Sequence, residues 1–221
     1  MRLLISAILK FIIGMLLVGM FIFIPAGSFN YFGGILFIAI LFIPIFLMGI
    51  ILFIKAPELL ERRLDGKETE KTQKGVVGFS ALVFISGFIV AGLDFRFSWS
   101  YVPKSVAIIA AVLFLIAYGI YAEVMRENAY LARTVTVQEN QKVIDTGLYG
   151  VVRHPMYAAT VLLFMMIPIV LGSWWSLICF AFYPIIIVIR ILNEEKVLSE
   201  QLEGYIEYKR KVKYRLLPFI W

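Results

Sequence analysis

Residues 31–54 of the chain read YFGGILFIAILFIPIFLMGIILFI, a run without a single charged side chain. A helix of about 20 apolar residues is long enough to cross the hydrocarbon core of a bilayer. Working outward from this run, we find comparable apolar segments at 3–24, 76–93, 106–122, 156–171 and 174–191. The chain therefore predicts an all-α, polytopic integral membrane protein with about six transmembrane helices.

The last two apolar segments are shorter than the others, and each contains a proline, Pro168 or Pro184. Proline removes a helical hydrogen bond and kinks the helix, so this pair forms either two spans or a kinked hairpin. Behind them, residues 194–212 place apolar side chains close to a helical period between charged ones. We expect there a C-terminal amphipathic helix that lies at the membrane interface or folds back over the cytoplasmic mouth.

The composition agrees with a membrane protein. Hydrophobic residues make up 62% of the chain and charged residues 16%, whereas globular proteins are about half apolar and about a quarter charged. One cysteine, Cys179, allows no intrachain disulfide, and with His154 as the single histidine we predict no metal site. The net charge of +6 falls in loops and the tail, which favours contact with membrane lipids and argues against nucleic acid as a partner.

Basic residues are distributed unevenly among the loops. They gather in the loop 55–75, in the segment 125–155 and in the tail after residue 191, whereas the loop 94–105 has two and the turn 172–173 has none. Positive residues stay on the cytoplasmic side of a membrane. We therefore expect a protein of the cell membrane whose two termini and His154 region face the cytoplasm.

The stretch 147–157, GLYGVVRHPMY, places four polar side chains at a membrane border: Tyr149, Arg153, His154 and Tyr157. Removing polar groups from water costs about 2–3 kcal/mol even on lenient insertion scales, unless the groups are paired or used. Two interpretations stay open for this stretch. It is an anchor at the level of the lipid headgroups, or it is the place of the chemistry.

A second polar group, Arg190, Glu194 and Glu195, ends the last apolar run. The spacing puts Arg190 and Glu194 on one helical face, as an ordinary i,i+4 ion pair or as a pair that holds a ligand. Adjacent glutamates at a cytoplasmic helix end bring no obvious structural gain, which favours the ligand. Residues 123–128 are read as anchors or as pocket wall. The polar loop 138–144 is read as solvated unless the other two groups form a site.

Four patterns taken together resemble a known family. They are G-x-Y-x-x-V-R-H-P-M-Y from Gly147, R-x-x-x-E-E-x-x-L from Arg190, G-Y-x-x-Y from Gly204 and Y-R-L-x-P from Tyr214. Over residues 128–221 the chain is similar to the isoprenylcysteine carboxyl methyltransferase family, which in turn resembles phospholipid N-methyltransferases. The resemblance implies one integrated membrane domain, with N-terminal transmembrane helices in 1–125 and a cofactor-binding, catalytic region in 126–221.

The resemblance also implies that S-adenosylmethionine is the cofactor, and which residues hold it. The residues so implied are Gln138, Gln141, Lys142, Val143, Ile144, Tyr149, His154, Pro155, Met156, Tyr157 and Glu194. Arg190 is implied to bind the substrate's carboxylate, which makes Arg190 and Glu194 the candidate catalytic residues. The chain departs from the family at Leu148, where many members have proline, and at Gln141, where some have histidine.

The chemistry of this cofactor suits those side chains. Its sulfonium cation is stabilised by aromatic faces and carboxylates, such as Tyr149, Tyr157 and Glu194. A carboxylate acceptor is already ionised near neutral pH, so positioning and desolvation can accelerate the reaction without a general base. We therefore expect a membrane methyltransferase that O-methylates an isoprenylcysteine-like carboxylate on a lipophilic small molecule or a lipidated acceptor.

Three alternatives stay open. A phospholipid amine N-methyltransferase has to remove a proton from its acceptor, for which the sequence offers His154 or Glu195. A membrane reductase of the NADPH-dependent sterol type needs more cationic side chains for the cofactor's phosphates than Arg153 and Arg190 supply. A non-enzymatic membrane scaffold leaves the joint occurrence of the motifs unexplained.

Overall fold

The computed structural model describes residues 2–64, 71–131 and 137–221, without the side chains of residues 71 and 72. Within these ranges the chain is helical and forms no strand. The elements are α1 (Arg2–Ala26), α2 (Phe32–Lys55), α3 (Pro57–Leu64), α4 (Lys71–Phe97), α5 (Lys104–Glu127), the 3-10 helix η1 (Gly147–Gly150), α6 (Pro155–Leu171), α7 (Trp174–Phe180), α8 (Tyr183–Gln201) and α9 (Tyr205–Lys211). Parts of two loops that carry the basic-residue argument, 65–70 and 132–136, lie outside the described residues.

Five helices of the described chain are long and apolar enough to cross a membrane. They are α1, α2, α4 from Gln73 onward, α5, and the combined segment Trp174–Gln201 formed by α7 and α8. The fifth apolar segment of the sequence forms α6, which is apolar but has only 17 residues. The predicted class, an all-α protein built to span a membrane several times, is confirmed. The expected six spans become five long helices and the shorter α6.

The pair formed by α6 and the α7–α8 segment is the predicted hairpin. Gly172, with a φ of 79°, ends α6, and α7 begins two residues later. This backbone conformation suits glycine because it has no Cβ. The kink lies between α7 and α8, where Pro184 stands in the first turn of α8 and a proline fits without losing a helical hydrogen bond.

The C-terminal helix predicted for 194–212 is not one element. Residues 194–201 continue α8, which therefore extends well past the apolar segment 174–191 expected from the sequence. The chain turns at Gly204, whose φ is 81°, and only α9 follows. Tyr205 and Tyr208 of α9 are buried against Leu202 and Val212. Of the two placements expected from the sequence, the fold has the one in which the tail turns back toward the lower end of the bundle.

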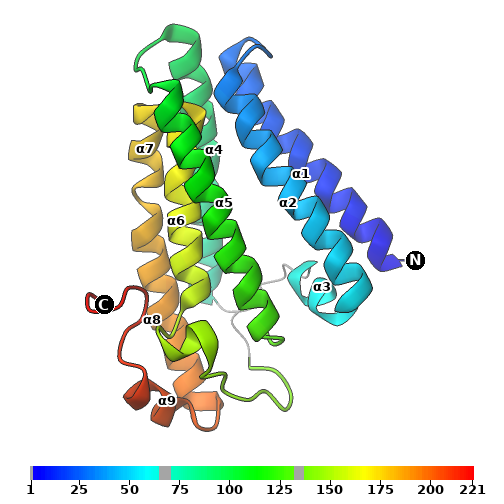
Figure 1. The fold of residues 1–221 in the computed structure, drawn as a ribbon, viewed down its shortest axis with the longest axis vertical. Coiled ribbons are helices and arrows are strands. Elements are labelled where there is room, and N and C mark those ends of the chain that lie inside the picture. The colour runs from blue at the N-terminus through cyan, green and yellow to red at the C-terminus, as the bar shows by residue number, and fades with distance from the viewer. Residues whose placement is uncertain (1, 65–70, 132–136) are drawn as a thin grey trace.

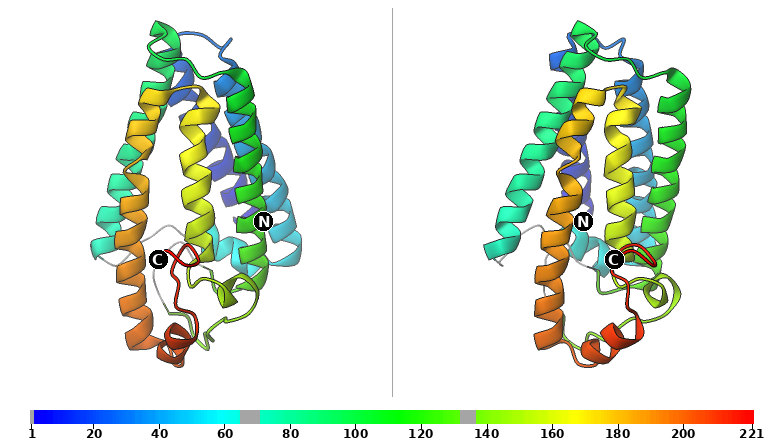
Figure 2. Two further views of the ribbon diagram at one scale, coloured as in Figure 1. Left: turned by 60° about the vertical axis from the view of Figure 1, so that its left-hand side comes forward. Right: turned by 90° about the vertical axis from the view of Figure 1, so that its left-hand side faces the viewer.

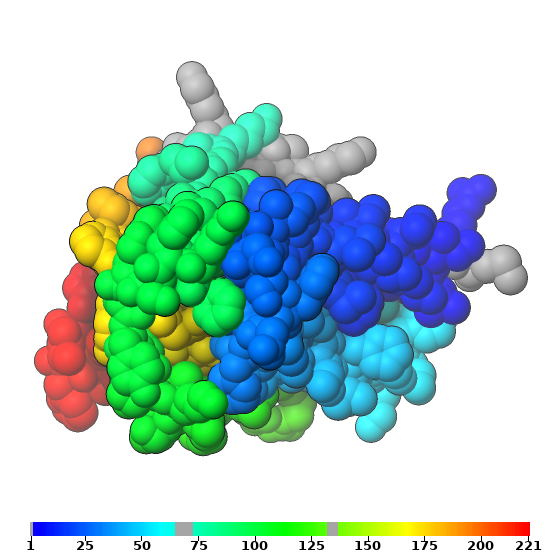
Figure 3. All heavy atoms as spheres, turned by 90° about the horizontal axis from the view of Figure 1, so that it is seen from above, coloured from blue at the N-terminus to red at the C-terminus, as the bar shows by residue number. Residues whose placement is uncertain are grey.

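Helices α4 to α8 form one block, and α1 and α2 lean away from it toward the lower end of the molecule, where α3 lies (Figures 1 and 2). Seen from above, α1 projects to one side of the rest (Figure 3). Close approach of the two parts depends on small residues. A Cβ on Gly33 of α2 would lie 2.7 Å from the carbonyl oxygen of Leu171, and one on Gly92 of α4 would lie 2.5 Å from that of Ile22.

At the upper end of the molecule, uncharged donors form hydrogen bonds to one buried carboxylate. Asp94, which is 1% exposed, accepts from the backbone and hydroxyl of Ser100 at 2.7 and 2.6 Å. The hydroxyl of Ser173 donates to the same carboxylate. Asp94 thereby ties the α4–α5 loop to the α6–α7 turn, and its buried oxygens are satisfied.

The lower end brings together the features that the sequence placed on one side. Both ends of the chain, α3, η1 and α9 lie in the lower half of the molecule, whereas the connections between α1 and α2, α4 and α5, and α6 and α7 lie at the top (Figure 1). The two basic residues that the sequence assigned to the opposite side, Arg96 and Lys104, flank the upper α4–α5 connection. The stretch 147–157 therefore shares an end of the bundle with both termini.

Candidate functional site

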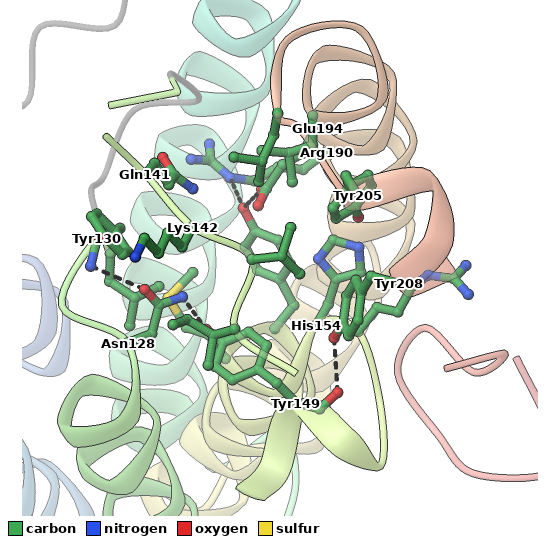
Figure 4. A pocket seen from close by; sticks show the side chains of 18 residues that line it. Asn128, Tyr130, Gln141, Lys142, Tyr149, His154, Arg190, Glu194, Tyr205 and Tyr208 are labelled. Atoms are coloured by element: carbon green, nitrogen blue, oxygen red, sulfur yellow. Dashed lines mark hydrogen bonds between the residues drawn. The ribbon is translucent and has the colours of Figure 1, made fainter. Parts of the chain in front are cut away.

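A cavity of about 100 Å³ opens at the lower end of the bundle, between α6, α8, α9 and the loop that precedes η1. Its lining consists of Asn128, Tyr130, Leu131, Gln141, Lys142, Val143, Ile144, Tyr149, Arg153, His154, Met156, Tyr157, Arg190, Glu194, Leu198, Leu202, Tyr205 and Tyr208. Figure 4 shows Arg190 and Glu194 reaching it from α8, with Tyr205 and Tyr208 of α9 on another side. All these residues come from the C-terminal half of the chain.

The firmest contact beside the cavity is centred on Glu195, which is 4% exposed. One carboxylate oxygen accepts from Nε of Arg153 at 2.7 Å and faces Nε2 of His154 at 3.3 Å. The other accepts from Nε of Arg215 at 3.0 Å, and Nζ of Lys209 lies 3.9 Å away. A buried carboxylate is tolerated when it is paired in this way. Glu195 is therefore a structural anchor and is not available as a general base.

The same cluster fixes the C-terminal segment to the 147–157 stretch. Nη1 of Arg153 donates to the carbonyls of Val212 and Lys213 at 2.7 and 2.9 Å. The backbone amides of Arg153 and His154 donate to the carbonyls of Tyr214 and Arg215, both at 2.9 Å. Arg153 thus reaches the edge of the cavity, but its guanidinium donates its hydrogen bonds to Glu195 and to the C-terminal segment and so holds that segment in place.

His154 joins the anchor to the cavity. Because an ionised carboxylate can only accept, Nε2 of His154 carries the proton that faces Glu195. The imidazole ring is stacked on Tyr157, with 5.7 Å between ring centroids and 28° between planes. The contact orients His154 in the cavity wall and leaves Nδ1 as its second polar atom.

Tyr157 connects the two α8 residues that the sequence singled out. Its hydroxyl donates to the carboxylate of Glu194 and accepts from Nε of Arg190 at 2.8 Å. The Arg190 guanidinium also lies over the Tyr157 ring, 5.8 Å from its centroid. One helical turn separates Arg190 from Glu194, so a tyrosine from α6 sits between the cation and the carboxylate at the cavity wall.

The shape of the 147–157 stretch is set by Glu127 at the end of α5. Its carboxylate accepts from the amide of Leu148 at 3.0 and 3.3 Å, which caps η1. Gly147 has a φ of 53°, and a Cβ there would lie 1.6 Å from the Glu127 carboxylate. Only glycine combines this positive φ with the absence of a Cβ that the nearby carboxylate requires. The polar end of α5, which the sequence left as anchor or pocket wall, is therefore partly a cap for the motif.

Neighbouring polar contacts hold Tyr149 against the cavity. Its hydroxyl accepts from the side-chain amide of Asn128 at 3.0 Å, and its carbonyl accepts from the hydroxyl of Tyr208 at 2.8 Å (Figure 4). Burial raises the pKa of Tyr149 well above the ordinary tyrosine value, and it does the same to Tyr208. Both hydroxyls therefore stay protonated at neutral pH.

Most of the residues predicted to hold the cofactor do line this cavity. Those that do are Gln141, Lys142, Val143, Ile144, Tyr149, His154, Met156, Tyr157 and Glu194, together with Arg190. Gln138 and Pro155 do not. Gln138 is used inside its own loop, where its amide donates to the carbonyl of Tyr130 at 2.9 Å. Pro155 is buried as the first residue of α6, where its fixed φ starts the helix.

Several lining residues were missed by the sequence analysis. Tyr205, Leu202 and Leu198 carried the helical periodicity from which a helix at the interface or folded back over the cytoplasmic mouth was expected. Tyr205 and Tyr208 are the two tyrosines of the G-Y-x-x-Y pattern. Tyr130 and Leu131 carried no signal. The hydroxyl of Tyr205 is buried and has no hydrogen-bond partner among the described residues. Since such an atom costs free energy when left unpaired, it marks a place for a polar ligand atom.

The cavity therefore combines tyrosine and histidine rings, apolar side chains, one carboxylate, Glu194, and three cationic side chains, Lys142, Arg153 and Arg190. This lining fits an organic ligand that carries both a cationic and an anionic group and whose remaining atoms are partly apolar and partly hydrogen-bonding. In the part of the chain that the structure describes, no three histidine, cysteine, aspartate or glutamate side chains are grouped as metal ligands would be.

Comparison with known proteins gives one family match. Residues 105–203 match the phospholipid methyltransferase family (PEMT). The matched range extends from the start of α5 to just beyond α8 and contains every lining residue except Tyr205 and Tyr208. No curated protein sequence matches the chain. The chain is thus similar to a methyltransferase family over the region that builds the cavity.

Proposed function

We propose that this protein is an S-adenosylmethionine-dependent membrane methyltransferase whose acceptor arrives from the bilayer. The proposal is carried by the cavity at the lower ends of α6 and α8, where the Glu194 carboxylate meets the aromatic rings of Tyr149, Tyr157 and His154. Its support from known proteins is the similarity of residues 105–203 to phospholipid methyltransferases.

In such a site the lining residues have different roles. S-adenosylmethionine supplies an electrophilic methyl group on a sulfonium centre. Glu194 provides a countercharge and the rings provide cation–π contact. The buried hydroxyl of Tyr205 offers a hydrogen bond to a polar atom of the ligand. The apolar side chains around them exclude water, which strengthens each of these contacts.

The cavity is smaller than the roughly 300–1,000 Å³ of typical small-molecule sites. Binding therefore displaces part of its wall. The loop that precedes η1 is tied to α9 by an ion pair between Lys211 and Asp145 at 2.6 Å, which is exposed and contributes little. By contrast, the α8 side is fixed through buried Glu195. We infer that the loop side opens while α6 and α8 stay in place.

For the acceptor we favour a carboxylate on a lipophilic molecule, bound by Arg190. A guanidinium presents a planar fork that matches a carboxylate, and Tyr157 holds Arg190 at the cavity through Nε. An ionised carboxylate needs no general base. This agrees with Glu195, which is committed to Arg153, His154 and Arg215.

A second candidate acceptor is a phospholipid amine, which the family match favours. An amine must lose a proton before it attacks. His154 is the side chain in the cavity suited to accept it, through Nδ1, because Nε2 faces Glu195. The two acceptors differ in their products, since a methyl ester is cleaved by alkali and an N-methyl group is not.

That difference defines the experiment. The purified protein is incubated with methyl-labelled S-adenosylmethionine and vesicles that contain either a prenylated cysteine or phosphatidylethanolamine. We expect labelled lipid from the first, with label released by alkali as methanol. Alkali-stable label from the second identifies the amine enzyme. No methyl transfer to either, together with saturable binding of NADPH, contradicts a methyltransferase and supports the reductase alternative.

We further propose that the lower end faces the cytoplasm in the cell membrane. The basic side chains Lys55, Arg126 and Lys142 lie at that end, in agreement with the positive-inside tendency. Cysteines introduced at 142 and at 100, in a chain with Cys179 replaced, test it in intact cells. An impermeant reagent should label position 100 and spare position 142; the reverse pattern contradicts this orientation.

A further inference from the structure

A second and larger hollow, of about 790 Å³, lies between the lower ends of α2 and α5 and the short helix α3. Its lining is Met48, Ile51, Leu52, Lys55, Ala56, Pro57, Glu58, Leu59, Arg62, Gly119, Ala122, Glu123, Met125, Arg126 and Ala129. Figure 1 shows α3 beside the lower end of α2. We refer to this hollow as the α2–α5 groove. It shares no lining residue with the cavity described above.

The lining of the α2–α5 groove changes along the membrane normal. Toward the middle of the bundle, α2 contributes Met48 and Leu52 and α5 contributes Gly119 and Ala122, all without charge. Toward the lower end, where both helices finish, the lining becomes charged. This order matches the depth profile of a lipid, with an acyl chain in the hydrocarbon and a charged headgroup at the border.

Two cationic side chains at the lower rim, Arg62 and Lys55, have hydrogen-bond donors that no described residue accepts from. Nε of Arg62 is buried and has no hydrogen-bond partner among the described residues, although Nη2 donates to the carbonyl of Ala129 at 2.8 Å. Its nearest acid, Glu58, is 3.9 Å away and largely exposed. Lys55, also on the rim, forms no ion pair with any residue that the structure describes. An unpaired, buried guanidinium donor is costly, and an anionic ligand would satisfy it.

The two other charges on the rim neutralise each other. Arg126 donates from Nε and Nη2 to the two carboxylate oxygens of Glu123, at 2.8 and 2.5 Å. With that pair set aside, Lys55 and Arg62 outnumber Glu58, and the rim carries a net positive charge. A phosphodiester is the anion that stands at this depth in a bilayer.

We propose that the α2–α5 groove binds one membrane glycerophospholipid. Its phosphate contacts Lys55 and Arg62, and an acyl chain lies along Met48, Leu52 and Gly119. Water in an apolar hollow at membrane depth finds no hydrogen-bond partners on the walls, so filling the hollow with an acyl chain is favourable. Arg62 also contacts Ala129, which follows cavity residue Asn128 in the chain. The bound lipid therefore supports the end of α5 that forms one wall of the other cavity.

Gly119 provides the variant that tests the site. Gly119 is exposed in the groove lining, and a Cβ at this position meets no atom within 4 Å, so the side chain of Gly119→Leu starts in open space and occupies part of the groove. Leucine also favours a helix interior over glycine by nearly 1 kcal/mol, so folding is not at risk. Gly78→Leu is the matched control, because a Cβ on Gly78 of α4 also meets nothing within 4 Å and lies outside the groove.

The experiment is native mass spectrometry of the full chain in detergent, titrated with dioleoyl phosphatidylglycerol or with dioleoylglycerol, which lacks the phosphate. We expect one saturable phospholipid adduct in the wild type and in Gly78→Leu. Gly119→Leu should lose it. The double variant Lys55→Gln/Arg62→Gln removes both charged contacts and should bind at least about tenfold more weakly, the loss expected for one charged hydrogen bond alone, whereas Lys104→Gln at the other end of α5 should not weaken binding.

Either of two results overturns the proposal. Equal adducts with dioleoylglycerol and phosphatidylglycerol would show that the phosphate is not recognised. An unchanged adduct in Gly119→Leu would place the lipid elsewhere. The outcome is independent of methyl transfer, because neither the readout nor any variant involves a residue of the cavity near Glu194.

Discussion

Glu194 and Glu195 are adjacent in the chain, yet the two sides of α8 on which they lie behave differently. Glu195 is buried and is paired with Arg153, His154 and Arg215 from segments that come together only in the folded protein. Glu194 is partly exposed and contacts the hydroxyl of Tyr157 at the cavity wall. The first carboxylate holds the site together, and the second lies at the cavity wall, where we propose that it meets a ligand. Variants on the two sides should therefore separate stability from binding.

The largest effect is expected from Glu195→Ala. It leaves the cationic side chains of Arg153, Arg215 and Lys209, which are buried or half-buried, without their carboxylate, and breaking a buried pair in this way costs about 3–5 kcal/mol. The tail that forms α9 loses its attachment at the same time. Thermal unfolding in detergent should show a strongly lowered midpoint, while Glu200→Ala, an exposed residue of the same helix, should leave it unchanged. Equal midpoints for the two variants would falsify the anchoring role.

Glu194→Gln should affect binding and spare the fold. Glutamine keeps the shape and still accepts from Tyr157, but it removes the negative charge offered to a sulfonium. Loss of a charged contact of this kind weakens affinity by about ten- to hundredfold. Calorimetric titration with S-adenosylmethionine checks this, with Glu200→Gln as control. Wild-type affinity in Glu194→Gln would remove this residue from the cofactor site.

Arg190→Lys separates the acceptor from the cofactor on the cavity side. Lysine keeps the charge but loses the fork and the Nε contact with Tyr157. We expect kcat to fall by about tenfold or more through misplacement of the acceptor, with the affinity for S-adenosylmethionine unaltered. The opposite result, a lost affinity with an unchanged KM for the acceptor, would assign Arg190 to the cofactor.

The smallest effect is expected from Tyr205→Phe. Its hydroxyl has no partner in the described part of the chain, so its removal should leave the unfolding midpoint equal or slightly higher. If the hydroxyl contacts the ligand, affinity for S-adenosylmethionine falls by about fivefold, the value of one neutral hydrogen bond. Tyr208→Phe is the contrasting variant, because Tyr208 donates to the carbonyl of Tyr149 and should lose stability as well. A stability loss in Tyr205→Phe would contradict the assignment.

The two glutamates also show which roles could be predicted from the sequence and which could not. The adjacent pair was taken to favour a ligand because no structural gain was visible. For Glu195 that gain exists, but its partner Arg153 lies 42 residues away along the chain. A pairing over such a separation leaves no periodicity or spacing in the sequence. The interpretation is therefore kept as a proposal for Glu194 and corrected for Glu195.

Other cavity residues also divide into those that the sequence grouped correctly and those that it did not. Tyr149, His154 and Tyr157 lie within one short motif, and local spacing was enough to group them. Tyr205 belongs to a separate segment whose apolar period predicted one continuous amphipathic helix, at the interface or folded back over the cytoplasmic mouth. The turn at Gly204 breaks that helix and brings the tyrosine under the bundle. Gln138 was assigned to the cofactor by the family resemblance, whereas its side-chain amide donates to the carbonyl of Tyr130 within its own loop.

The sequence by itself determined the all-helical class, the approximate limits of the apolar segments and the common end of the basic loops with the 147–157 stretch. These follow from hydropathy, helical period and charge, which are local properties of the chain. Only the tertiary structure decided the break between α7 and α8, the cap that Glu127 forms on η1, and the different contacts of Glu194 and Glu195. These depend on contacts between distant segments, and the energy of a buried charge is set by what surrounds it in the folded protein.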